Sequence, residues 1–194
     1  MKHVRLEPRV VIVRISENVH KLCVGSELTS GYNPRMDVNR LVREYLEGSN
    51  LMQIATCAKN IPWVCTVCFA VDEKLNVYWF SSHETRHSQE IILNSRVAVA
   101  VVQPHTLGNP VRGLQFSGLA SELKNPDEIR HSLSCNAKRY GVTAQKTRAL
   151  QAELESGQAK YGIYRIKPDS FLLYDTLNFP KSPQQKLDLN DTLI

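Results

Sequence analysis

The sequence lacks the long apolar run that a membrane-spanning helix requires. No stretch of its 194 residues approaches the roughly 18 consecutive apolar residues of such a helix. The N-terminus also lacks a basic segment followed by an apolar one, which is the pattern of a secretory signal. These absences predict a cytoplasmic protein with no membrane partner.

Clustered basic charge is missing as well. The formal net charge is +5, but the lysines and arginines are scattered along the chain rather than gathered on one segment. A nucleic-acid-binding face gathers its basic residues, and a single-strand site interleaves them with aromatic residues. The sequence therefore predicts no nucleic-acid partner and leaves a nucleic-acid-binding barrel as a distant alternative. The positive charge suits a small anionic ligand.

Cysteine is scarce, and the single CxxC has no second pair. Five cysteines are an odd number for a chain without an export signal, which favours reduced thiols over a disulfide framework. Cys65 and Cys68 lie in an apolar run that predicts a strand, where residues three apart point to opposite faces. Their sulfurs would not meet at one metal ion, so we predict no metal site and buried structural thiols.

The apolar pattern predicts one domain that consists mainly of short strands. The expected strands cover residues 51–57, 63–71, 75–81, 96–102, 114–121, 161–166 and 171–174. The expected helices cover residues 37–47, 84–93 and 126–155, the last with a break near Gly141. The first three strands follow one another closely, which indicates a meander. Residues 1–35 form an N-terminal extension, residues 36–179 the domain, and residues 180–194 a loose tail or an arm on a partner subunit.

Helices are inserted among these strands rather than alternating with them. This order argues against a doubly wound parallel sheet and favours a small antiparallel barrel with accessory helices. The predicted helical region at 126–155 carries Lys138, Arg139, Lys146 and Arg148, which we interpret as a solvated basic face.

One strand–turn–helix segment carries chemistry. The strand ends at Ser81 and Ser82, and the helix begins near Thr85, Arg86 and His87. A helix N-terminus offers free N–H groups and the positive end of the peptide dipoles, so it attracts phosphate. Hydroxyl groups and a guanidinium add donors to such a site. The alternative is an ordinary capped helix with Arg86 and His87 on its surface.

The order of motifs resembles the pyridoxamine 5′-phosphate oxidase-like family of flavin mononucleotide (FMN) proteins. The resemblance is carried by Phe80-Ser81, Thr85-Arg86-His87, Ile91, Asn94-Ser95-Arg96-Val97, the apolar run 98–102, and the segments 104–107 and 112–118. It covers residues 37–177 in element order, and its specific part is 62–120. It implies an FMN-binding split β-barrel.

The same resemblance implies a set of cofactor contacts. Thr85, Arg86 and His87 would hold the FMN phosphate, with His87 in place of the more usual lysine. Cys65, Thr66 and Val67 would pass beneath the isoalloxazine ring, and Phe80 and Ser81 would flank the ribityl chain. Gln115 would reach the flavin from a second subunit, because the family places FMN at a homodimer interface.

Two departures from the family concern the substrate. Ala70 stands where pyridoxamine phosphate oxidases carry a lysine that meets the substrate phosphate, and residues 167–171 replace their C-terminal Arg-x-His. We therefore expect a flavin oxidoreductase that acts on another small molecule with an electron donor, its catalytic residues unknown. His83 beside the flavin is a candidate for a direct role. The alternative is a binding protein that holds flavin or haem without turnover.

Overall fold

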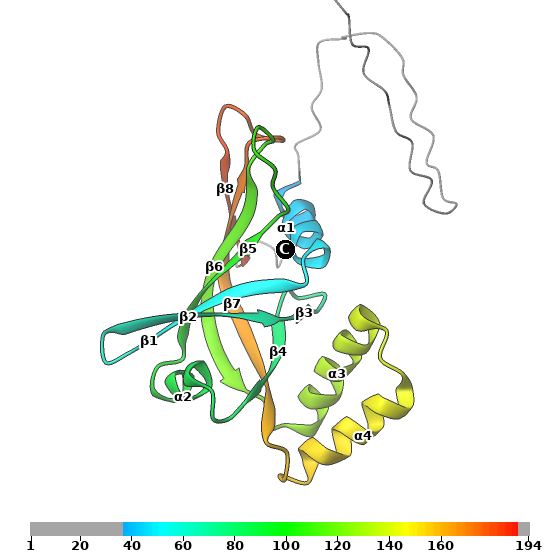
Figure 1. Ribbon diagram of the computed structural model, residues 1–194. Coiled ribbons are helices and arrows are strands. Elements are labelled where there is room, and N and C mark those ends of the chain that lie inside the picture. The colour runs from blue at the N-terminus through cyan, green and yellow to red at the C-terminus, as the bar shows by residue number, and fades with distance from the viewer. Residues whose placement is uncertain (1–36, 190–194) are drawn as a thin grey trace, which may run out of the picture. The chain divides into compact units, whose positions relative to one another are not determined.

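The computed structural model describes residues 37–189 and builds them around one antiparallel sheet (Figure 1). Its strands are β1 (Leu51–Ala58), β2 (Ile61–Cys68), β3 (Ala70–Val71), β4 (Val77–Ser82), β5 (Arg96–Val102), β6 (Arg112–Glu122), β7 (Tyr161–Asp175) and β8 (Gln184–Asp188). Their order in the sheet is β2-β1-β5-β6-β7-β4-β3, and β8 pairs with β7. The sheet curls into a half-barrel, which confirms the predicted split-barrel fold.

Four helices accompany the sheet within residues 37–189: α1 (Val38–Gly48), α2 (Arg86–Leu93), α3 (Pro126–Tyr140) and α4 (Ala144–Glu155). The side chain of Asp37 accepts from Asn39 N and caps α1. None of these helices combines the length and the hydropathy needed to cross a bilayer.

The core forms in two clusters. The larger one fills the half-barrel and includes Trp79 stacked on Tyr164, with ring centroids 5.2 Å apart. The smaller one lies between β4, β7 and α3 and includes Tyr78, Leu133 and Ile163. Successive residues of β4 therefore serve different clusters, because side chains alternate between the faces of a strand.

Several predicted strands are wrong in extent or partner. The run 63–71 is broken at Phe69 into β2 and β3, and the expected meander does not form. β2 pairs with β1, whereas β4 crosses to the other edge of the sheet and pairs with β7. A local apolar pattern predicts strands but contains no information on which distant strand each will join.

The end of the chain also differs from expectation. The two strands predicted at 161–166 and 171–174 are one strand, β7, which passes through Pro168 opposite Gly118. Residues 180–194 were expected as a tail or an arm, and their described part contains β8, which pairs with β7 of the same chain beyond the end of β4. The predicted extension at 1–35 lies outside the described residues and stays a prediction.

Candidate functional site

The start of α2 gathers hydroxyl groups around a buried histidine. Ser81 Oγ lies 2.6 Å from His87 Nε2 and 3.0 Å from Thr85 Oγ1. Thr85 Oγ1 also lies 2.8 Å from Ser88 Oγ and donates to the carbonyl of Ser82 at 2.9 Å. The structure therefore brings together three of the predicted phosphate and ribityl residues, Ser81, Thr85 and His87.

Thr85 is the N-cap of α2, but its side chain makes no capping hydrogen bond. The helix begins at Arg86, two residues later than the expected start at residue 84. The hydroxyl of Thr85 is held within the cluster, and no side chain of residues 37–189 hydrogen-bonds to the first N–H groups of α2. Such groups, at the positive end of the helix dipole, are the usual donors to a bound phosphate.

His87 is 7% exposed and points inward. Burial lowers the pKa of His87 below the ordinary histidine value of 6.5, against a smaller opposing effect of Glu90. The imidazole of His87 is therefore neutral at neutral pH. Its Nε2 is bound to Ser81, so His87 fixes the hydroxyl cluster rather than offering a cation to a ligand.

Arg86 is separated from this cluster and held by other residues. Its Nε donates to Glu90 Oε1 at 2.7 Å, and its guanidinium carbon lies 4.5 Å from the ring centroid of Trp63. Glu90 also accepts from Thr56 at 2.5 Å. Hydrogen bonds from Thr56 and Arg86 hold the pKa of Glu90 below its usual value. No described residue bonds to the terminal guanidinium nitrogens of Arg86, whose side chain is 43% exposed. The site keeps one oriented cation that can meet an anion.

Sequence reasoning missed both partners of Arg86. Arg86 and Glu90 have the i, i+4 spacing of a helical ion pair, so this contact was detectable. Trp63 comes from β2, and nothing in the local sequence links it to α2.

A second group of predicted residues lines a cavity on the other side of β4. Thr66, Val67 and Phe80 face it, together with residues of α3 and α4, and its volume is about 540 Å³. Phe80 and Ser81 are neighbours on β4 but point to opposite faces, Phe80 toward Tyr161 and Ser81 toward His87. Their side chains cannot flank one ribityl chain from the same direction.

Cys65 and Gln115 lie in two further places. Cys65 packs on the larger core cluster, and burial raises the pKa of its thiol. Gln115 is exposed on the outer face of the sheet, in a groove of about 450 Å³ that it shares with Gln53 and Ala100. Only strand residues line that groove. Gln115 is thus directed away from the α2 cluster of its own chain.

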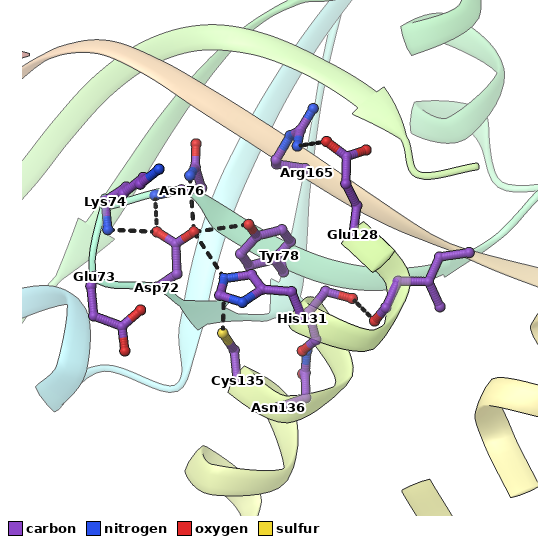
Figure 2. A network of polar contacts seen from close by, with 12 residues as sticks. Asp72, Glu73, Lys74, Asn76, Tyr78, Glu128, His131, Cys135, Asn136 and Arg165 are labelled. Carbon is purple, nitrogen blue, oxygen red and sulfur yellow. Dashed lines mark hydrogen bonds and ion pairs between the residues drawn. The ribbon is translucent and has the colours of Figure 1, made fainter. Parts of the chain in front are cut away.

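A polar network fixes α3 against the sheet, as Figure 2 shows. Asp72 accepts hydrogen bonds from the side chains of Asn76 and Tyr78 at 2.9 Å each, and His131 of α3 approaches it at 3.3 Å. Burial alone would raise the pKa of Asp72, but these hydrogen bonds outweigh it and hold the pKa below the usual value. Arg165 of β7 reaches Glu128 of α3 at 2.6 Å.

Cys135 completes this network without becoming a nucleophile. Its sulfur lies 3.8 Å from the Nε2 atom of His131, which also faces Asp72. Burial, with the charges of Asp72 and Glu73, raises the pKa of Cys135 to about 11. The thiol is protonated at neutral pH and is held in a structural contact. Within residues 37–189 no three His, Cys, Asp or Glu side chains are arranged to hold a metal ion.

Two other expectations need correction. Arg139 is not on a solvated face, because it donates to the carbonyls of Leu46 and Ser49 and lies over Phe69. Cys68 is exposed rather than buried. His83 stays a candidate for a direct role, with its Nε2 atom 2.8 Å from the carboxylate of Glu122.

Ala70 lies in β3 and is fully buried, so its side chain faces the core.

The profile of a family described as pyridoxamine 5′-phosphate oxidase matches residues 38–174. The chain belongs to this family. The matched segment runs from α1 to β7, which hold every predicted site residue.

Individual relatives are distant. A UPF0306 protein of Pasteurella multocida is 23% identical over 145 residues, which are 74% of this chain and 93% of that protein. A conserved hypothetical protein of Mycobacterium tuberculosis has a similar structure, with a TM-score of 0.62 at 15% identity over 78% of this chain and 93% of the other. The haem storage protein HutZ of Vibrio cholerae also has a similar structure. Its TM-score is 0.54 at 19% identity, over 69% of this chain and 91% of the other. At these identities the structural likenesses show the fold.

Proposed function

We propose that this protein binds FMN with its phosphate at the start of α2 and acts as an oxidoreductase on a small molecule. The observation that carries the proposal is the uncapped N-terminus of α2 beside Arg86. The residues fit the group: backbone N–H groups, hydroxyls and one oriented guanidinium are donors, as a phosphate requires. FMN would supply the transfer of hydride or electrons, and the protein would bind and orient it.

Different residues of the chain would then contact different parts of FMN. Arg86 would contact the phosphate through its terminal nitrogens while Glu90 and Trp63 keep the guanidinium in place. Ser81 and His87 would hold Thr85 in position through their hydrogen bonds. The backbone of Cys65, Thr66 and Val67 would offer hydrogen bonds to the polar edge of the flavin ring, as the family resemblance implies.

The decisive experiment compares FMN with riboflavin, which lacks the phosphate. Arg86→Ala should weaken FMN binding by about 1.5–3 kcal/mol, the scale of a charged hydrogen bond, and leave riboflavin binding unchanged. Arg96→Ala is the matched control, because Arg96 forms an exposed ion pair with Asp169 on another strand. Fluorescence quenching of the flavin measures both affinities. An equal loss for both ligands would refute the phosphate assignment, and no flavin binding by the natural protein would refute the function.

A homodimer is part of the same proposal. Gln53 Oε1 is buried without a protein partner, and Gln53 shares with Gln115 the outer groove that strand residues alone line. A second chain on this face would supply a donor and carry Gln115 toward the partner's flavin. Light scattering should give a mass of twice that of one chain. Ala100→Arg in the groove should lower the measured mass toward that of the monomer. Ala144→Arg on the exposed face of α4 is the control. A monomer with FMN bound would contradict the dimer.

A binding protein without turnover is the second candidate. The likeness to a haem storage protein favours it, since the fold also occurs in a protein of that description. The absorption spectrum separates the cases: a flavin spectrum that is bleached by NADH or NADPH supports the oxidoreductase, a stable flavin spectrum supports the binding protein, and a Soret band after addition of hemin supports haem.

A further inference from the structure

The cavity between β2, β4, α3 and α4 has a chemistry of its own. We propose that it binds an uncharged, largely apolar molecule with one or two aromatic ring systems, and that this molecule is the substrate. The second half of this statement rests on the proposed function, because it takes the flavin to lie along β2. The first half rests only on the cavity. Its volume of about 540 Å³ is in the range of small-molecule sites.

No charged side chain lines the cavity. Its walls are formed by Phe80, Leu133, Leu150 and Val142, with Val67 and Ala137 between them. Transfer of an ion from water to such a surface costs several kcal/mol unless a counter-charge is present. A phosphorylated or carboxylated ligand would find none, whereas an aromatic ring would gain apolar contacts on both faces.

The polar groups of the lining suit a neutral ligand. Asn136 is 8% exposed, and its Nδ2 donates to the carbonyl of Ser132 at 2.9 Å. Within the described part of the chain nothing donates to its Oδ1, which is left as an acceptor. Tyr140 uses its hydroxyl on the carbonyl of Phe69 at 2.6 Å, so it offers the cavity its ring. The arrangement can orient a ligand that carries one hydroxyl or amine group.

The two helical walls differ in how firmly they are held. Three contacts hold α3 in place. Arg139 donates to the carbonyl of Leu46 in α1, Tyr140 donates to the carbonyl of Phe69, and His131 approaches Asp72 as shown in Figure 2. α4 has no fully buried residue and contributes Thr147 and Leu150 to the cavity. An element with so little buried apolar surface opens at low free-energy cost. α3 therefore fixes the shape of the cavity, and α4 gives access to it.

The other large cavity does not offer the same opportunity. It has a volume of about 480 Å³ and is lined by His83, Glu122, Lys124 and Arg130 among others. Glu122 is paired with both His83 and Lys124, at 2.8 and 2.7 Å, and Arg130 is paired with Asp127. Its charged groups already satisfy one another, so a ligand would have to break these pairs.

A matched pair of fluorescent probes tests the ligand class. N-phenyl-1-naphthylamine is neutral, and 8-anilinonaphthalene-1-sulfonate has the same rings with one negative charge. Both become fluorescent in apolar sites. The full-length protein should bind the neutral probe with one site and more than tenfold more tightly than the sulfonate. Equal affinities, or tighter binding of the sulfonate, would overturn the proposal.

Substitutions at Ala137 show whether the probe occupies this cavity. Ala137→Trp should fill it and weaken binding of the neutral probe more than tenfold, and Ala137→Lys should shift the preference toward the sulfonate. Ser134→Trp and Ser134→Lys are controls on the same helix, because Ser134 is exposed and does not line the cavity. Thermal denaturation identifies any variant that fails to fold. Unchanged binding in both folded Ala137 variants would place the probe elsewhere and refute the site.

The link to the flavin has a separate readout. In FMN-loaded protein the neutral probe at saturation should perturb the visible flavin absorption bands, and Ala137→Trp should remove this effect. If FMN binds and the bands do not move, the cavity is not the substrate site. If the probe behaves as expected and FMN does not bind at all, the proposed function fails while the ligand class of the cavity stands.

Discussion

Replacement of His87 by glutamine should flatten the pH dependence of stability on the acid side of neutrality. His87 is buried beside Ser81, and burial lowers its pKa in the folded protein below the ordinary histidine value of 6.5. The unfolded chain therefore binds a proton at pH values where the folded protein does not. The stability that the neutral imidazole contributes is complete above pH 6.5 and is lost as the pH falls toward the lowered pKa. Over that interval the free energy of unfolding decreases by up to about 1.4 kcal/mol per pH unit.

The carboxylates with lowered pKa values do not titrate between pH 5 and 6.5. Their pKa values lie below the ordinary 3.8 of aspartate or 4.5 of glutamate, so these groups remain ionised above pH 5; they are Asp72, Glu90, Glu122 and Asp175. Urea denaturation followed by tryptophan fluorescence at pH 5, 6, 7 and 8 measures the slope. His105→Gln, in an exposed loop, is the control. We expect His87→Gln to cost about 1 kcal/mol at pH 8, the scale of one hydrogen bond, and to lose less between pH 6.5 and 5 than the natural protein. Parallel curves for the two proteins would refute the burial of a neutral His87.

Three further predictions concern the fold and the substrate. Arg139→Ala should lower the free energy of unfolding by about 2–3 kcal/mol in urea denaturation, because it removes two charged hydrogen bonds to carbonyls and a contact with Phe69, whereas Lys138→Ala should change it by less than about 0.5 kcal/mol. Gly118→Ala should lower it by about 1–3 kcal/mol, because the added Cβ would collide with the Lys167 carbonyl oxygen, and an unchanged melting temperature would show that β6 and β7 can move apart to accommodate it. FMN-loaded protein should not oxidise pyridoxamine phosphate efficiently, because Ala70 stands where the family enzymes carry a phosphate-contacting lysine and residues 167–171 replace their Arg-x-His, and turnover near about 10 s⁻¹ in a pyridoxal phosphate assay would contradict this.

The sequence was sufficient for the elements and insufficient for their pairing. The helix at α1 followed from Asp37 and the helical spacing of its apolar residues, which are local signals. The continuity of β7 did not, because Lys167, Pro168, Asp169 and Ser170 have the composition of a turn. Opposite the step from Ser117 to Gly118, β7 carries one extra residue, Asp169, and this β-bulge keeps the two strands paired past the proline, which lacks a backbone donor. The information that makes this segment a strand lies in β6.

The candidate site shows the same division. Ser81, Thr85 and His87 were found because they lie within one strand–turn–helix segment, and the structure joins them by hydrogen bonds. The solvated interpretation of Arg139 failed, because its partners Leu46 and Ser49 lie far away in the sequence. Neither a charge pattern nor a helical period can show that a basic side chain reaches carbonyls at the end of another helix.

Arg86 shows how the structure changes the argument for a phosphate site. A guanidinium at a helix N-terminus opposes the helix dipole, and a bound anion would relieve this conflict. Glu90 and Trp63 relieve part of it within the chain, so the conflict by itself no longer requires a ligand. The uncapped N–H groups of α2 are not relieved in this way, because the Thr85 hydroxyl that would cap them is committed to Ser82 and to the cluster around His87. The case for an anion at this helix therefore depends on the backbone, with Arg86 as the oriented cation beside it.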